Sequence, residues 1–354
     1  MVEISNAVSL ENVENGPVIR GWHTYLSVGV TVAVFAVLGT MVDLGEVWKN
    51  VARCNIGFLT LGALAHYATY PIRGFRWHRC LRHLPIECGK AKLGLLVFFY
   101  NSVDNVVPAK LGDLYGAHLA RINCGIRRSA ALGSIVFLRM VDAWVVFVLA
   151  LLGSWLLFSE RLPQTVFWVL IGGGGFAAVV TVMMMVFFWL KRSLPGWLPE
   201  NVREMIRAFQ TGMWPRGTEL VCIAALTALI WTLETLWIFF LARSFGLKLG
   251  AAESIFMTMI PVIATAFPLT PSGAGAVELT FYGSLRVLGV SSPFAVSLTV
   301  VNRFVDYWLH IGLGALMWAV RGKIGLRTWR DEVPHQDLQD MDSLRSLSKQ
   351  EGFS

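Results

Sequence analysis

Long uninterrupted apolar segments constrain the fold of this chain more than any other feature of its sequence. One of them runs from Ser129 to Phe158 and is interrupted only by the charged residues Arg139 and Asp142. About 20 apolar residues in a helix cross the hydrocarbon core of a bilayer. Only 15% of the 354 residues are charged, against about 25% in a typical soluble protein. The sequence therefore predicts an all-α polytopic membrane protein, and continuous rather than alternating hydrophobicity argues against a β-barrel.

Six segments are expected to be full spans, at about 25–42, 56–72, 129–158, 164–190, 218–242 and 293–320, and the second is expected to continue as helix to about 83. Two further apolar stretches, 93–107 and 254–268, are shorter and end in the sequences NSVDNVVPAKLGD and FPLTPSGAGAVE. Proline and glycine interrupt a helix, and non-helical backbone at membrane depth survives only inside protein or beside a water-filled cavity. We expect two re-entrant helical hairpins here, and the alternative is two ordinary spans with kinks.

The distribution of basic residues predicts the orientation of the chain. Lysine and arginine cluster in 73–92, in 191–217 and after residue 320. Cytoplasmic loops of membrane proteins are enriched in these residues. Six spans with both termini in the cytoplasm place all three clusters there, and the two hairpins then enter from opposite sides. The formal net charge of +7 is thus a topology signal with some attraction to anionic lipid, and nucleic acid is not an expected partner.

An internal repeat relates the two halves of the chain. The motif Arg-x-x-Asp-x-Trp begins at Arg139 and again at Arg303, 164 residues later, and each copy follows a Pro-x-x-x-Gly motif, at Pro108 and at Pro271. Each unit contains three full spans, an odd number, so the second unit would be inserted upside down. Inverted repeats with broken helices occur in many secondary transporters, where the binding site lies between the repeats. The expected domains are a polar N-terminal segment, two membrane repeats and a polar tail, at 1–20, 21–158, 159–325 and 326–354.

The repeated motif places Arg139, Asp142, Arg303 and Asp306 inside predicted spans. A charged side chain at the centre of a spanning helix costs about 2.5–3.5 kcal/mol on insertion scales. Residues three apart share a helix face, so each arginine is expected to pair with the aspartate that follows it. Two roles remain open. The pairs are structural, or each arginine exchanges its aspartate for an anionic group such as phosphate, which suits the planar guanidinium fork.

The broken segments add further candidate binding groups. A helix that starts after Pro108 or Pro271 points free N–H groups and the positive end of its dipole into the space between the repeats. Glycine at such a break lets the backbone approach a ligand closely. A structural role is the alternative for the polar residues of these segments. Besides the two Arg-x-x-Asp pairs, the candidate substrate-binding residues are Asn105, Lys110, Asp113, Thr270, Ser272, Gly273, Gly275, Glu278 and Tyr307.

Catalytic and metal-binding motifs are not found in the sequence. It has no H-E-x-x-H and no G-x-S-x-G. The closely spaced His78, Cys80, His83 and Cys88 fit no standard zinc pattern, and five cysteines without a C-x-x-C give no indication of a disulfide framework. We expect no catalytic residue, no metal and no cofactor. The alternative is an embedded lipid-modifying enzyme that uses the basic segment 73–92.

The motifs in their order resemble the membrane domain of the lysylphosphatidylglycerol synthase/flippase-like family. The resemblance covers roughly residues 20–325 and rests on NSVDNVVPAKLGD, FLRMVD, PLTPSGAGAVE and NRFVDYW. In the first block, the family pattern has an arginine where this chain has Lys110 and a glutamate where it has Asp113. The second block fits closely, with Pro268, Thr270, Pro271, Gly273, Gly275 and Glu278. The soluble aminoacyl-transferase domain of fused family members does not occur in this sequence.

The resemblance implies a multi-pass lipid flippase-like protein of the bacterial inner (plasma) membrane. It would carry an anionic lipid through a polar cavity between the inverted repeats. The candidate lipids are a phospholipid, an aminoacyl-phospholipid and a polyprenyl-phosphate-linked sugar. Arg139 and Arg303 would bind the phosphate, and Asp142 and Asp306 would hold these arginines in the empty cavity. The alternative is a membrane subunit that presents lipid to a separate glycosyl- or aminoacyl-transferase.

Overall fold

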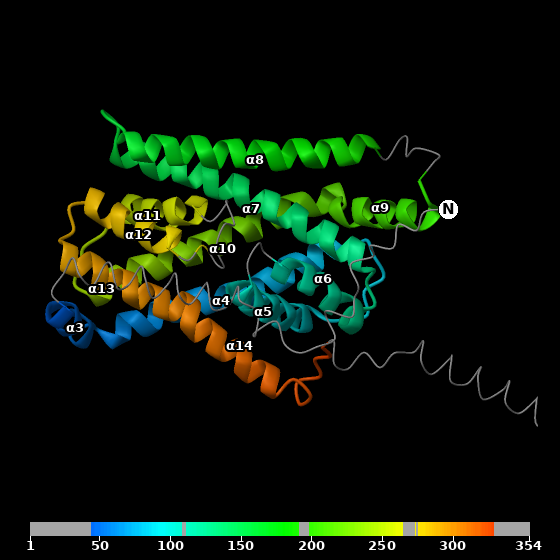
Figure 1. The fold of residues 1–354 in the computed structure, drawn as a ribbon, viewed down its shortest axis with the longest axis horizontal. Coiled ribbons are helices and arrows are strands. Elements are labelled where there is room, and N and C mark those ends of the chain that lie inside the picture. The colour runs from blue at the N-terminus through cyan, green and yellow to red at the C-terminus, as the bar shows by residue number, and fades with distance from the viewer. Residues whose placement is uncertain (1–43, 108–110, 191–197, 265–272, 274, 329–354) are drawn as a thin grey trace, which may run out of the picture.

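The computed structural model describes residues 44–107, 111–190, 198–264, 273 and 275–328. All elements in this part of the chain are helical (Figure 1), as the sequence predicts. In chain order they are α3 (Leu44–Ala52), α4 (Ile56–Leu81), α5 (Lys90–Val106), α6 (Leu111–Cys124), α7 (Arg128–Leu157), α8 (Gln164–Leu190), α9 (Glu200–Met213), α10 (Gly217–Ser244), α11 (Ala251–Ala264), α12 (Ala276–Val287), α13 (Ser292–Arg303), the π-helical segment η4 (Phe304–Leu309) and α14 (His310–Ala319).

Three of the described helices, α7, α8 and α10, are long and apolar enough to cross a membrane. Helix α8 leaves large apolar side chains such as Trp168 and Trp189 exposed along its length, a surface that lipid would cover. Helix α4 has 26 residues, but its C-terminal half carries Arg73, Arg76 and Arg79, so it is less apolar. The predicted span 25–42 lies outside the described residues, and the total of six spans stays a prediction.

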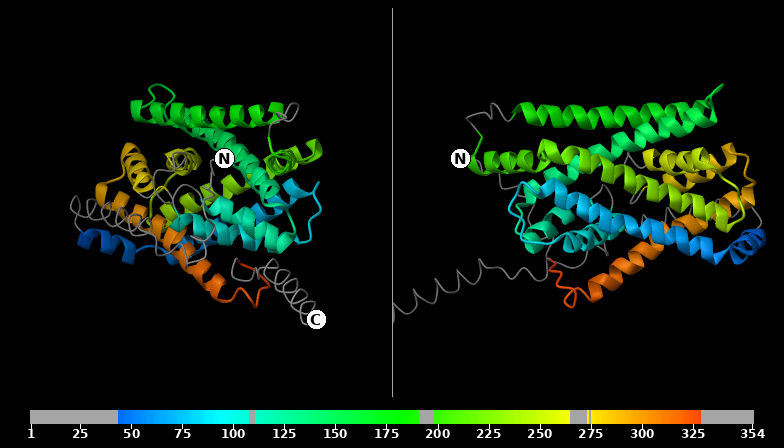
Figure 2. Two further views of the ribbon diagram at one scale, coloured as in Figure 1. Left: turned by 45° about the vertical axis from the view of Figure 1, so that its right-hand side comes forward. Right: turned by 180° about the vertical axis from the view of Figure 1, so that it is seen from behind.

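Helices α4 and α10 run side by side along the length of the molecule (Figure 2). Glycine allows α4 to approach its neighbours closely. A Cβ atom on Gly62 would lie 2.8 Å from the Trp237 ring of α10, and one on Gly74 would overlap the backbone of Gly94 in α5. Helix α4 is therefore held in close contact with α10 and α5.

Both interrupted apolar segments form packed pairs of helices, α5 with α6 and α11 with α12. The breaks include residues 108–110 and 265–272, which lie outside the described residues. Figure 1 places the two pairs toward opposite ends of the long axis, with α11 and α12 near α3 and with α6 nearer α9. This arrangement agrees with hairpins that enter from opposite sides, and their depth in a membrane stays a prediction.

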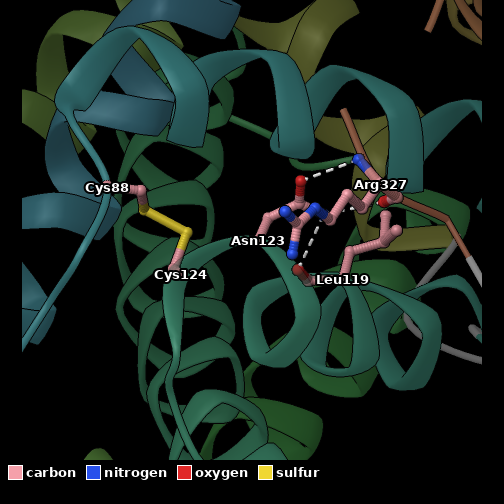
Figure 3. The surroundings of a disulfide bond; sticks show 5 residues. All are labelled: Cys88, Leu119, Asn123, Cys124 and Arg327. Atoms are coloured by element: carbon pink, nitrogen blue, oxygen red, sulfur yellow. Dashed lines mark hydrogen bonds between the residues drawn. A yellow bond between two sulfur atoms is a disulfide. The ribbon is translucent and has the colours of Figure 1, made fainter. Parts of the chain in front are cut away.

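A disulfide bond between Cys88 and Cys124 closes the base of the α5–α6 hairpin (Figure 3). The number and spacing of the cysteines gave no indication of a disulfide, and the structure corrects this for Cys88 and Cys124. The two residues are 36 positions apart in sequence, and their Cα atoms lie 4.9 Å apart because α6 returns to the point where α5 begins. Beside the disulfide, the Asn123 side chain hydrogen-bonds both the N–H and the C=O of Arg327. These contacts fix the segment after α14 to the end of α6.

The segment predicted as the last span, 293–320, is helical from α13 through α14 but has a widened turn at η4. This π-helical turn begins directly after Arg303 and contains Asp306. Short π-helical insertions occur frequently at functional sites, because they change the direction of side chains along a helix. The second copy of the repeated motif therefore differs in backbone conformation from the first copy, which lies in regular α-helix in α7.

Candidate functional site

A cavity of about 470 Å³ lies between the helices and is lined by residues of α4, α5, α7, α8, α10, α11, α12, α13 and η4. Its volume is in the range of small-ligand sites. Three amides, Asn101, Asn105 and Asn302, add hydrogen-bonding groups to its wall. The charged and titratable side chains of the lining are His66, Tyr70, Arg73, Arg139, Asp142, Glu234, Arg303 and Asp306. The lining thus contains three arginines and three carboxylates. Ionisable residues inside membrane segments are by default candidates for a functional site.

The structure brings five of the predicted binding residues to this cavity, namely Asn105, Arg139, Asp142, Arg303 and Asp306. Three others contact the cavity arginines: Asp113 binds Arg139, and Glu278 and Tyr307 contact Arg303. Lys110, Thr270 and Ser272 lie outside the described residues.

Gly273 and Gly275 precede α12 and have φ angles of 65° and 87°. Residues with a side chain rarely adopt these angles, so glycine is required here for the turn into the helix. The Glu278 carboxylate accepts a hydrogen bond of 2.7 Å from the Gly275 N–H. The sequence predicts that the start of this helix offers free N–H groups to a ligand, but the structure shows that the Gly275 N–H is already bound by a side chain of the same helix.

Arg139 of α7 is the most accessible of the three cavity arginines. Its Nη2 and Nε atoms donate to the two carboxylate oxygens of Asp113 at 2.8 and 3.2 Å, and Asp104 lies 3.7 Å away. Its side chain nevertheless remains 32% exposed. An anion that enters the cavity can therefore reach this guanidinium group.

Arg303 of α13 is enclosed instead. Its Nε atom lies 2.8 Å from the Glu278 carboxylate, and the two side chains are only 2% and 1% exposed. The Tyr307 ring covers the guanidinium group at 4.3 Å. In both halves of the chain, a long-helix arginine thus binds a carboxylate in the first turn of the second hairpin helix, Asp113 in α6 and Glu278 in α12.

The predicted pairing within each Arg-x-x-Asp motif is wrong. Arg139 bonds Asp113 of α6 and Asp142 bonds Arg76 of α4, so both members of the first motif have their partners on other helices. Neighbouring hairpin helices offer better-placed carboxylates. In the second motif, Arg303 pairs with Glu278 and Asp306 lies 3.6 Å from His66.

Asp142 instead binds a buried arginine of α4. Arg76 donates to its two oxygens at 2.6 and 3.0 Å, and the Trp231 indole N–H donates at 3.2 Å. Arg76 also donates to the Thr227 hydroxyl at 2.8 Å. This network joins α4, α7 and α10 at one end of the cavity lining, and a two-pronged Arg–carboxylate contact of this kind is among the stronger polar contacts in proteins.

Asp306 faces a second network on α4 and α10. Its Oδ1 atom lies 3.6 Å from Nε2 of His66. The other ring nitrogen of His66 is 2.8 Å from Glu234, which also accepts a hydrogen bond of 2.9 Å from Arg73. A histidine thus lies between two carboxylates on the cavity wall, and one of these carboxylates is shared with an arginine.

Sequence reasoning missed Arg73, Arg76, Glu234 and His66 as members of the site. The two arginines lie in the basic segment 73–92, which is predicted to be cytoplasmic, and His66 and Glu234 lie inside the predicted spans 56–72 and 218–242. A signal was present, because Arg73, Arg76, Arg79 and Arg82 recur every third residue, a spacing at which each arginine adjoins the next on the surface of a helix. Arg79 and Arg82 bind Glu219 of α10. Regular spacing of basic residues, together with acidic residues inside the predicted span 218–242, indicates paired helices rather than a loop.

The apolar helices and the charged cavity between them define a multi-pass α-helical membrane protein with a polar interior site. The sequence model of the lysylphosphatidylglycerol synthase TM region matches residues 25–314, and the chain belongs to this family. It is 23% identical over 221 residues to UPF0104 membrane protein MJ1078 of Methanocaldococcus jannaschii, covering 62% of this chain and 93% of that protein. It is 19% identical to UPF0104 membrane protein PH1989 of Pyrococcus horikoshii over 83% of this chain and 96% of the relative. The resemblance inferred from the sequence motifs is confirmed.

Proposed function

We propose that the protein moves an anionic lipid across the bilayer by admitting its phosphate-bearing headgroup to the cavity. The observation that carries this proposal is the accessible guanidinium group of Arg139 in a cavity of about 470 Å³. A guanidinium group binds phosphate through two parallel hydrogen bonds. The acyl chains would stay in the bilayer while the headgroup crosses between the helices. The proposal includes no catalytic step.

Arg73 supplies a second positive group for the headgroup. It lines the same cavity, and its bond to Glu234 at 2.9 Å joins it to one carboxylate. The enclosed Arg303 suits a structural role better, so the phosphate site differs from the one expected from the repeat alone. The amides of Asn101 and Asn105 can donate to the remaining phosphate or ester oxygens.

A transbilayer assay tests this function directly. The purified chain is reconstituted in vesicles that contain phosphatidylglycerol with a fluorescent headgroup-side label, and a membrane-impermeant reductant quenches the label in the outer leaflet. We expect the inner-leaflet label to become accessible in vesicles with the protein and to stay protected in protein-free vesicles. Binding of the lipid without transbilayer movement would contradict translocation and favour the alternative of a subunit that presents lipid to a separate transferase.

We propose that the basic end of the molecule faces the cytoplasm of a prokaryotic cell. His83 of the first basic cluster bonds Thr211 of the second. Arg327 of the third bonds Asn123, whose neighbour Cys124 is bonded to Cys88 of the first cluster, so the three clusters lie at one end. Enrichment in lysine and arginine favours the cytoplasmic side. The Cys88–Cys124 disulfide lies at the same end and favours an oxidising compartment, so the orientation requires its own measurement.

Cysteine labelling decides the orientation. Trp214 and Trp48 are exposed residues at opposite ends of the described helices, one after α9 and one in α3. In a Cys54→Ala background, we expect an impermeant maleimide to label Trp48→Cys in intact cells and Trp214→Cys only after the cells are lysed. The Cys54→Ala chain alone gives the background signal. The reverse labelling pattern would place the basic end outside.

A further inference from the structure

We propose that His66 and Glu234 form a proton-binding site that couples headgroup entry to proton uptake. This inference rests on the proposed lipid translocation and adds its energy source. The site is on the wall of the same cavity, and His66 is only 3% exposed. Chains of His, Asp and Glu inside a membrane are the usual side chains of proton relays in pumps and transporters.

The hydrogen bonds define the starting protonation state. An ionised carboxylate only accepts hydrogen bonds, so the 2.8 Å contact between Nδ1 of His66 and Glu234 requires the proton on Nδ1. Nε2 then has a free lone pair in the neutral ring. Within the described part of the chain, Nε2 has no hydrogen-bond partner. Its neighbour Asp306 lies 3.6 Å away and is 42% exposed.

The charge balance of the cavity supplies the reason for proton uptake. Each of the three lining arginines already pairs with a carboxylate, Arg139 with Asp113, Arg303 with Glu278 and Arg73 with Glu234, so an entering phosphate adds uncompensated negative charge. A buried charge without a partner is strongly unfavourable. Arg73 binds Glu234 at 2.9 Å, and an entering phosphate would share this arginine with the carboxylate. Protonation of Glu234 then restores the balance, because the arginine is shared between carboxylate and phosphate.

The proposed step conserves the proton count. A proton arrives from cavity water through Asp306 and bonds to Nε2 of His66. The proton on Nδ1 moves to the Glu234 carboxylate, and the bond between Nδ1 and its hydrogen breaks. The ring is neutral before and after the step, Glu234 becomes a neutral acid, and one proton enters with one phosphate charge. Lipid and proton would therefore cross in the same direction.

The charged groups around His66 favour a histidine that exchanges protons over a histidine that is permanently charged. Acidic groups face it from α10 and η4, and an arginine of its own helix lies beyond the first carboxylate. The His310 ring of α14 is stacked on two tyrosines of α4 that also contact the His66 ring. The charged and titratable neighbours are Glu234, Asp306, Arg73, Tyr67, Tyr70 and His310.

A pH gradient across reconstituted vesicles tests the inference. The full chain is placed in vesicles with labelled phosphatidylglycerol, the outside is made acidic, and the lipid distribution is measured with the impermeant reductant. A dye inside the vesicles reports proton entry at the same time. With one proton per lipid, a gradient of one pH unit is worth about 1.4 kcal/mol and should produce about tenfold enrichment in the inner leaflet. Equal internal and external pH should give no enrichment.

Two variants identify the residues. His66→Gln retains an amide that can donate to Glu234 but does not titrate, and Glu234→Gln removes the proton acceptor. We expect both variants to exchange lipid between leaflets without enrichment and without lipid-dependent proton entry. His118→Gln, a histidine of α6 that does not line the cavity, is the matched control and should behave as the native chain. If His66→Gln does not give a monodisperse protein, Glu234→Gln carries the same comparison.

The outcomes separate this inference from the proposed function. If the native chain exchanges lipid but the pH gradient does not change the lipid distribution, the proposed proton site is excluded and the proposed translocation is retained. Enrichment by both variants equal to that of the native chain would also overturn it. A native chain that moves no lipid at any pH would remove translocation and the coupling together.

Discussion

Replacing Arg139 with alanine is expected to slow transbilayer movement of anionic lipid by about 100-fold. A hydrogen bond to a charged group contributes about 1.5–3 kcal/mol, and about 2.7 kcal/mol of lost interaction with the phosphate in the rate-limiting state corresponds to this factor. Arg139 is the cavity arginine with the largest exposed fraction, 32%. The rate is measured by the access of an impermeant reductant to labelled phosphatidylglycerol in vesicles.

Two control variants make the Arg139 result specific. Arg207→Ala removes an exposed arginine of α9 that bonds Glu200 and should leave the rate unchanged. Arg139→Lys keeps the charge but loses the planar fork and should give an intermediate rate. A native rate for Arg139→Ala, in a protein that folds normally, would exclude this guanidinium group as the phosphate-binding group.

Replacing Arg303 with alanine is expected to destabilise the protein by about 3–5 kcal/mol, because removal of one member of a buried ion pair leaves an uncompensated charge. The charge left behind is Glu278, whose side chain is 1% exposed. The measurement is thermal unfolding of the purified chain in detergent. We expect a large loss in midpoint temperature and poor recovery of folded protein.

A double variant distinguishes loss of the pair from loss of packing. Arg303→Met together with Glu278→Gln removes both charges, and the glutamine can still accept the Gly275 N–H that Glu278 binds. It should regain most of the stability, since apolar or neutral replacement of a whole buried pair is often tolerated. Equal losses in the single and the double variant would contradict the account of Arg303 as half of a buried pair.

The helical architecture could be predicted because it depends on segment length and hydrophobicity. The apolar run from Ser129 to Phe158 corresponds closely to α7, which spans Arg128–Leu157. The proline- and glycine-rich breaks also correspond to separations between paired helices, α5 from α6 and α11 from α12. These features are local, so a single sequence carries them. The inverted relation of the two halves still rests on the motifs and on the opposite placement of the two helix pairs.

The partners of the buried charges could not be predicted because they depend on tertiary packing. Arg139 and Asp142 are neighbours on one helix, but each binds a residue from another element, Asp113 and Arg76. The direction of side chains on a helix and the position of the hairpin helices decide this choice. Neither is visible in the spacing of the motif. The Cys88–Cys124 disulfide escaped prediction for the same reason, since it depends on the return of α6 to the start of α5.

The arginines of α4 show how the assignment of basic residues to the cytoplasmic side can hide members of a binding site. Positive-inside reasoning assigned Arg73 and Arg76 to a cytoplasmic segment. Helix α4 continues to Leu81, as expected, but both arginines are part of buried networks. The basic end is rich in arginine even without these two residues, so the predicted orientation does not depend on them. Helices α4 and α10 therefore supply cavity-lining residues, among them His66, Arg73 and Glu234.

The most direct test of the central claim is photochemical cross-linking of a lipid headgroup to the cavity wall. The native chain is reconstituted with phosphatidylglycerol that carries a diazirine on its headgroup, irradiated and mapped by peptide mass spectrometry. The account predicts adducts on the α5 and α7 peptides that contain Asn101, Asn105 and Arg139, and their loss in Arg139→Ala. Adducts confined to the outer surface of α8 around Trp168 and Trp189, and unchanged in the variant, would contradict it.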